Sequence, residues 1–115
     1  MEVIKIIVYN VVGNSFCVEA DDGQLIFNLL DKAFKENRTV QLDFQNVEMI
    51  TSAFLNTAVG QLYRGYDVNF IKEHLSVVSM LPEDMALLKR SVDTAKLFYS
   101  DPDRLQKSID EILGE

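Results

Sequence analysis

The chain has 115 residues and a mass of 13.1 kDa, which is the size of one domain, and 48% of its residues are hydrophobic. Its formal net charge of −7 disfavours direct binding to nucleic acid or to an anionic membrane surface. The single cysteine, Cys17, excludes an internal disulfide and a multi-cysteine zinc site. The apolar run at residues 3–9 is too short to cross a bilayer. We therefore expect one cytoplasmic domain over residues 1–115, with no membrane contact.

The first third of the chain predicts two strands and a helix. β-Branched residues dominate residues 2–9 and predict a strand, the residues at 10–14 predict a turn, and residues 16–18 predict a second, short strand. Asp21 or Asp22 is suited to cap a helix. The apolar side chains of that helix follow the spacing of one buried face, at Ile26, Leu29, Leu30 and Ala33.

Residues 39–47 alternate between apolar and polar side chains. Val40, Leu42 and Phe44 fall on one face, whereas Gln41, Asp43 and Gln45 fall on the other. A strand covered by helices on both faces would read as a continuous apolar run. The alternation therefore predicts a sheet with helices mainly on one face.

Helices dominate the remainder of the chain. Residues 52–64 predict a helix that ends near Gly65, residues 67–75 a short helix, and residues 76–80 a strand. Pro82 opens a further helix, and a last helix is predicted over residues 101–115. The expected core-facing side chains of these helices are Leu55, Val59, Leu62, Tyr66, Met85, Leu88, Val92 and Ala95, followed by Leu105, Ile109, Ile112 and Leu113.

Catalytic groups are sparse. The chain has one histidine, His74, one cysteine, no glycine-rich phosphate loop and no cluster of metal ligands at a recognisable spacing. Nothing in the sequence brings His74 to Cys17, and a thiol on a short apolar strand is typically an inert, buried group. We expect no enzyme activity, no cofactor and no metal.

The turn that leads from residues 42–47 into the helix at residue 52 resembles a known family. Leu42-Asp43-Phe44-Gln45-Asn46-Val47 is similar to the strand that precedes the Asp-Ser-Ser/Ala-Gly motif of STAS domains, which include the anti-sigma-factor antagonists. Thr51 and Phe54 depart from that motif. The match is closer to the STAS-like domains of unknown function, whose pattern resembles Ser52-Ala53-Phe54-Leu55 and Ala58-Val59-Gly60-Gln61-Leu62.

This resemblance implies an α/β fold with an approximately four-stranded mixed sheet, helices mainly on one face and an extra C-terminal helix. It also implies a regulatory protein-binding module whose partner is a kinase or ATPase of the anti-sigma type. Ser52 corresponds to the phosphorylated serine of the antagonists, and Thr51 is the second choice. The partner-binding residues would be Thr51, Ser52, Asn56 and Gly60, the last three of which recur at i, i+4 and i+8.

Three alternatives stay open. A serine or threonine at the start of a helix is also its natural N-cap, and a cap and a phosphorylation site are compatible roles for Ser52. Gly60 indicates a close approach, either of the sheet or of a partner. The alternative function is a sensor for a nucleotide or another anion, held between the turns at residues 10–14 and 49–52.

Overall fold

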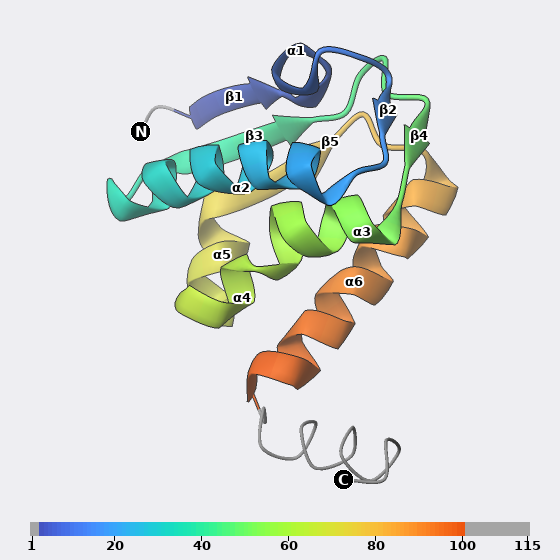
Figure 1. The fold of residues 1–115 in the computed structure, drawn as a ribbon. Coiled ribbons are helices and arrows are strands. Elements are labelled where there is room, and N and C mark those ends of the chain that lie inside the picture. Colours follow the sequence, from blue (N-terminus) through green and yellow to red (C-terminus); the bar gives the residue numbers. More distant parts are fainter. Residues whose placement is uncertain (1–2, 101–115) are drawn as a thin grey trace, which may run out of the picture.

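Three parallel strands form the main sheet of the computed structural model, which describes residues 3–100 (Figure 1). They are β1 (Val3–Ile7), β3 (Thr39–Asp43) and β5 (Leu75–Val78), in the order β1-β3-β5. A separate two-stranded sheet pairs β2 (Phe16–Cys17) with β4 (Met49–Ile50), also in parallel. The expected mixed sheet of about four strands is therefore wrong. The α/β class and the parallel sheet are consistent with a STAS-like fold.

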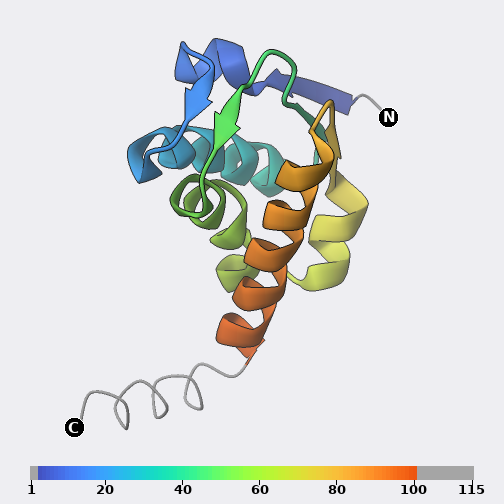
Figure 2. The ribbon, with the colours of Figure 1, turned by 90° about the vertical axis from the view of Figure 1, so that its right-hand side faces the viewer.

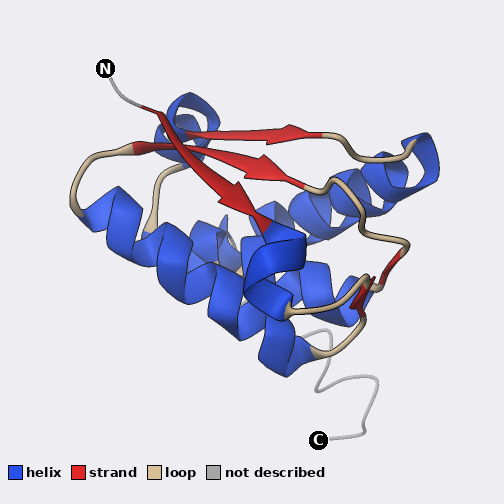
Figure 3. Cartoon of the chain, turned by 90° about the horizontal axis from the view of Figure 1, so that it is seen from above, coloured by secondary structure: helices blue, strands red, loops and turns tan. Residues whose placement is uncertain are grey.

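The helices form a layer under one face of the main sheet, as the alternation in β3 predicts (Figure 3). In chain order they are α1 (Val8–Val12), α2 (Ala20–Lys35), α3 (Ser52–Leu55), the π-helix η1 (Asn56–Gly60), α4 (Leu62–Gly65), α5 (Val68–His74) and α6 (Pro82–Ser100). The segment from α3 to α4 packs between α2 and α6, and α6 runs along its outer side (Figure 2). The expected helix over residues 101–115 lies outside the described residues.

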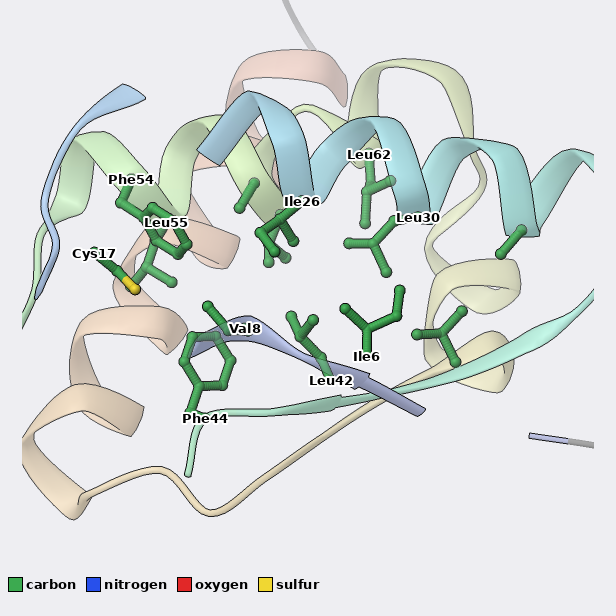
Figure 4. Close-up of a cluster of buried hydrophobic side chains, with 14 of the residues drawn as sticks. Ile6, Val8, Cys17, Ile26, Leu30, Leu42, Phe44, Phe54, Leu55 and Leu62 are labelled. Atoms are coloured by element: carbon green, nitrogen blue, oxygen red, sulfur yellow. The ribbon is translucent and has the colours of Figure 1, made fainter. Parts of the chain in front are cut away.

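The core lies between the sheet and the helices (Figure 4). Ile6 and Leu42 point from β1 and β3 toward Ile26 and Leu30 of α2. The segment from α3 to α4 completes the core with the fully buried side chains of Phe54, Leu55 and Leu62. Burying a large apolar side chain contributes about 1.5–3 kcal/mol, so these residues anchor the helical layer to the sheet.

Gly23 allows α2 to pack closely against the segment that follows β4. A Cβ atom at residue 23 would lie 2.6 Å from the backbone oxygen of Phe54 and 3.0 Å from Cβ of Thr57. Only the absence of a side chain permits this approach. The contact fixes the position of the two helical segments relative to each other.

The expected strand over residues 2–9 ends at Ile7, because Val8 turns inward and begins α1. Val8 is fully buried, and Gly13 ends α1 with a φ of 88° and an N–H that donates to Tyr9 O. The turn expected at residues 10–14 is thus partly helical. The burial of Val8 and the glycine stop override the strand propensity of the β-branched residues.

Three expectations about burial and caps are also wrong. The α2 helix begins after Glu19, so neither Asp21 nor Asp22 caps it, although both lie in its first turn. Leu29 is 39% exposed and Met85 is 53% exposed. On each of these helices the face that packs against the core is narrower than the face that carries apolar side chains.

The open face of the main sheet carries a buried carboxylate, Asp43, which we had expected on the solvent side. Lys5 Nζ on the adjacent strand lies 3.2 Å from Asp43 Oδ2, and the Gln45 N–H donates to Asp43 Oδ1 at 2.9 Å. The Gln45 N–H is the main cause of a lowered pKa of Asp43, with further contributions from Lys5 and Ser79. These partners explain how β3 tolerates the charge.

Candidate functional site

The strand-to-helix corner between β4 and α3 is held in place by Thr51. Its Oγ1 accepts a hydrogen bond from the Phe54 N–H at 3.2 Å and donates to Val18 O at 2.7 Å. Thr51 is therefore the N-cap of α3, and Ser52 is the first residue of the helix instead of its cap. The same side chain connects the corner to the segment that follows β2.

The two-stranded sheet places the corner beside the start of α2 (Figure 1). Phe16 pairs in register with Met49, and Cys17 pairs with Ile50. The inner members, Cys17 and Ile50, are buried, whereas Phe16 and Met49 are each 51% exposed. This short sheet therefore presents two large apolar side chains to the outside.

Ser52, Ala53 and Asn56 are exposed, and Ser52 begins α3 two residues after β4 ends. Met49 precedes Ser52 by three residues, and Ser52 and Asn56 occupy one helical face at i and i+4. Together with Phe16, these residues form what we call the corner surface: Phe16, Met49, Ser52, Ala53 and Asn56. It combines an apolar pair with small and polar side chains.

Gly60 does not belong to the corner surface, because it is buried beneath α6. A Cβ atom at residue 60 would meet Cβ of Ala95 at 3.7 Å, which is an ordinary contact. The element that covers Gly60 is thus α6, and it does not come close enough to require a glycine, so the close approach expected of the sheet or a partner is wrong. Of the four expected partner-binding residues, the structure exposes Ser52 and Asn56, half-buries Thr51 and covers Gly60.

A π-helix interrupts the helix that was expected to run unbroken over residues 52–64. The Gln61 N–H donates to Asn56 O at 3.1 Å, and the Gln61 side chain bonds to Thr57 O at 2.8 Å and to Gln24 Oε1 at 3.0 Å. Such insertions frequently mark functional segments. Within this insertion Asn56 is exposed and Val59 is buried in the core.

The structure brings together residues that flank the turns of the alternative sensor hypothesis, at residues 10–14 and 49–52. The Glu48 N–H donates to Ser15 O at 2.8 Å, and Ser15 Oγ donates to Glu48 Oε2 at 3.0 Å. The open hollow beside them is lined by Tyr9, Ser15, Asn46, Val47 and Glu48. Among these described lining residues the only charge is the carboxylate of Glu48, which repels an anion.

The structure keeps Cys17 and His74 apart. Cys17 is buried on β2, and burial, followed by the charge of Asp22, raises the pKa of its thiol to about 11. His74 lies at the end of α5, where its ring stacks on Phe70 at 3.9 Å and its Nδ1 bonds to Phe70 O at 2.8 Å. Because β2 and α5 lie at opposite sides of the molecule (Figure 1), the two groups do not form a nucleophile-base pair.

Within residues 3–100, no group of three or more histidine, cysteine, aspartate or glutamate side chains is arranged to hold a metal ion. Within the same residues, no helix combines the length and the apolar character that crossing a membrane requires.

The family of STAS-like domains of unknown function matches residues 22–85, which is more than half of the chain. The chain therefore belongs to that family. The matched segment runs from α2 to the start of α6 and contains the whole corner between β4 and α3. Comparison with curated proteins and with solved structures gives no match.

Sequence reasoning missed the two apolar members of the corner surface. The sequence predicts a short strand at Phe16, without showing which side its side chain faces, and a turn at Met49. The signal for both was the pair of dipeptides Phe16-Cys17 and Met49-Ile50, which form β2 and β4. Successive side chains of a strand point to opposite faces, so if the two segments pair, one residue of each dipeptide is buried and the other is exposed. Such a pairing is too short to be recognised by periodicity.

Proposed function

We propose that this chain is a non-catalytic regulatory module that binds a protein partner through the corner surface. The observation that carries the proposal is the register pair Phe16 and Met49, both half-exposed, with the exposed Ser52 three residues after Met49 in the chain. Apolar side chains that gather on a surface beside polar ones are typical of interaction sites. The likeness of the corner to anti-sigma-factor antagonists supports a kinase or ATPase of the anti-sigma type as the partner.

The backbone of the corner is suited to rigid docking. Thr51 joins two chain segments through its hydroxyl group, and its own N–H donates to Cys17 O at 3.2 Å. A preorganised surface loses little conformational freedom on binding, so more of the contact energy appears as affinity. Large apolar side chains at the centre of such a contact commonly account for most of that energy.

Phosphorylation of Ser52 is the proposed switch. Its side chain is exposed at the first helical position, where a kinase can reach it. A phosphate would add about 1.5–2 negative charges directly beside the apolar pair. Glu19, Asp21 and Glu48 already make this end of the domain acidic, so we expect the added charge to repel a partner that fits the unmodified surface.

The test begins with affinity purification of the tagged chain from its own cell, with mass spectrometry of the bound proteins and of Ser52. The affinity of the recovered partner is then measured for the parent chain, Ser52→Ala and Ser52→Asp. We expect Ser52→Asp to weaken binding about tenfold or more, while Ser52→Ala binds as the parent does. Ser76→Asp is the matched control, because it adds the same charge at an exposed serine of the other sheet.

Phe16→Ser and Met49→Ser test the apolar pair itself. Both side chains are half-exposed, so we expect the fold to be retained and the partner affinity to fall at least tenfold for each. Partner binding that is the same for Ser52→Asp, Phe16→Ser and the parent chain would eliminate the corner surface as the docking site.

A further inference from the structure

An apolar hollow of about 210 Å³ lies on another part of the molecule, among η1, α4, α5, β5 and α6. Its walls are aliphatic side chains from four of these elements: Val59, Ile71, Leu75, Val77, Leu88 and Val92. An apolar cavity of about 150 Å³ in another protein is sufficient to bind benzene. The hollow therefore has room for a small apolar group.

Three polar groups border this hollow, and they come from different helices. Lys72 belongs to α5, Lys96 to α6 and Tyr63 to α4. The lysines are exposed, so their aliphatic stems line the wall while their ammonium groups reach water. Among the described residues that line the hollow, none is acidic.

The two charged residues among the described lining residues are thus both basic, although the whole chain has 18 acidic and 11 basic residues. Within residues 3–100, the lysines in ion pairs are Lys5, Lys35 and Lys89. Neither Lys72 nor Lys96 has a carboxylate partner in that part of the chain. Two unpaired ammonium groups at the edge of an apolar hollow complement a ligand that has an apolar body and an anionic end.

We propose that the hollow is a binding site for a small amphipathic carboxylate, with its apolar body among the aliphatic side chains and its carboxylate between Lys72 and Lys96. The carboxylate stays near water, so its desolvation costs little, and the apolar body supplies most of the affinity. For a ligand of this size we expect a dissociation constant in the micromolar to millimolar range.

Octanoate is the probe, and its binding to the purified chain is measured by NMR titration of the methyl groups of Ile71, Val77 and Val92. Octan-1-ol tests the apolar body alone, and acetate tests the charge alone. We expect octanoate to bind more than tenfold more tightly than either. Each exposed ion pair is worth up to about fivefold in affinity, so two lysines account for this difference.

Lys72→Met and Lys96→Met each should weaken octanoate binding by about threefold to fivefold without unfolding the chain, because both side chains are exposed. Lys32→Met is the matched control, since Lys32 borders a different apolar hollow beside Ile4 and Leu29. Val92→Phe fills the proposed site and should abolish the shifts of the Ile71 and Val77 methyl groups on addition of octanoate. Equal binding of octanoate and octan-1-ol, or weaker octanoate binding in Lys32→Met than in Lys72→Met, overturns the proposal.

Discussion

Gly23→Ala is expected to separate α2 from the segment that follows β4. The new Cβ atom would lie 2.6 Å from Phe54 O, 3.0 Å from Thr57 Cβ and 3.2 Å from Ala58 N. Two of these three atoms belong to the backbone and cannot rotate away. The helices must therefore shift, and the packing of Phe54 beneath them must change.

The magnitude follows from two opposing effects. Overpacking of a core by one methyl group costs about 1–3 kcal/mol, and the contact with backbone oxygen favours the upper end. Alanine in place of glycine inside a helix stabilises the helix by about 1 kcal/mol. We expect a net loss of about 2 kcal/mol in the free energy of unfolding. For a domain of this size the midpoint of thermal unfolding should fall by about 8 °C.

Gly60→Ala is the matched control, because its new Cβ atom would meet Ala95 at 3.7 Å, without a clash. The helical preference for alanine should leave this variant as stable as the parent, or more stable by up to about 1 kcal/mol. Urea unfolding followed by circular dichroism measures both variants. Gly23→Ala equal in stability to Gly60→Ala would refute the close contact between α2 and the segment after β4.

Four shorter predictions concern individual side chains. Thr51→Ala should lower the free energy of unfolding by about 1–2 kcal/mol, because the N-cap and the hydrogen bond to Val18 are lost. Thr51→Ser keeps the hydroxyl group, so it should retain most of the parent's free energy of unfolding in the same urea assay. The pKa of Asp43 is lowered in the folded chain, so its carboxylate stabilises the fold at pH values above about 3.9, the pKa in the unfolded chain. This contribution is lost as the pH falls through the lowered pKa. The free energy of unfolding should therefore decrease less steeply between pH 7 and pH 3 in Asp43→Asn than in the parent chain. Burial, followed by the hydrogen bond to Asp31, raises the pKa of Tyr66 to about 12. The stabilisation that the protonated Tyr66 gives the fold should therefore be lost as the pH rises from about 10 to about 12. In an ultraviolet titration, Tyr66→Phe should lack the last tyrosine to ionise. Cys17 should react slowly with iodoacetamide at pH 8 in the native chain and rapidly in urea, and rapid reaction in both states would contradict its burial.

The sequence was informative where a signal is local. Alternation at Val40, Leu42 and Phe44 predicted both β3 and its single covered face. Asp67 caps α5 through the Asn69 N–H at 3.2 Å, and Pro82 opens α6, as these residue types favour. The same local pattern around residues 42–62 indicated the family to which the chain belongs.

Features that depend on distant partners could not be predicted. The strand β4 exists only because Met49 and Ile50 pair with residues more than 30 positions earlier in the chain. The burial of Asp43 depends on Lys5 from another strand, and the covering of Gly60 depends on where α6 packs. Periodicity assigns a face to a helix, but it does not say which element covers that face.

Hydrogen exchange measured by mass spectrometry, on the chain alone and bound to its recovered partner, tests the docking proposal most directly. We expect new protection on binding to concentrate in residues 15–19 and 48–57, which contain the corner surface, and to be absent when Ser52 carries a phosphate. Protection confined to α5 and α6, with exchange at Phe16, Met49 and Ser52 unchanged, would contradict the proposal that the corner binds the partner.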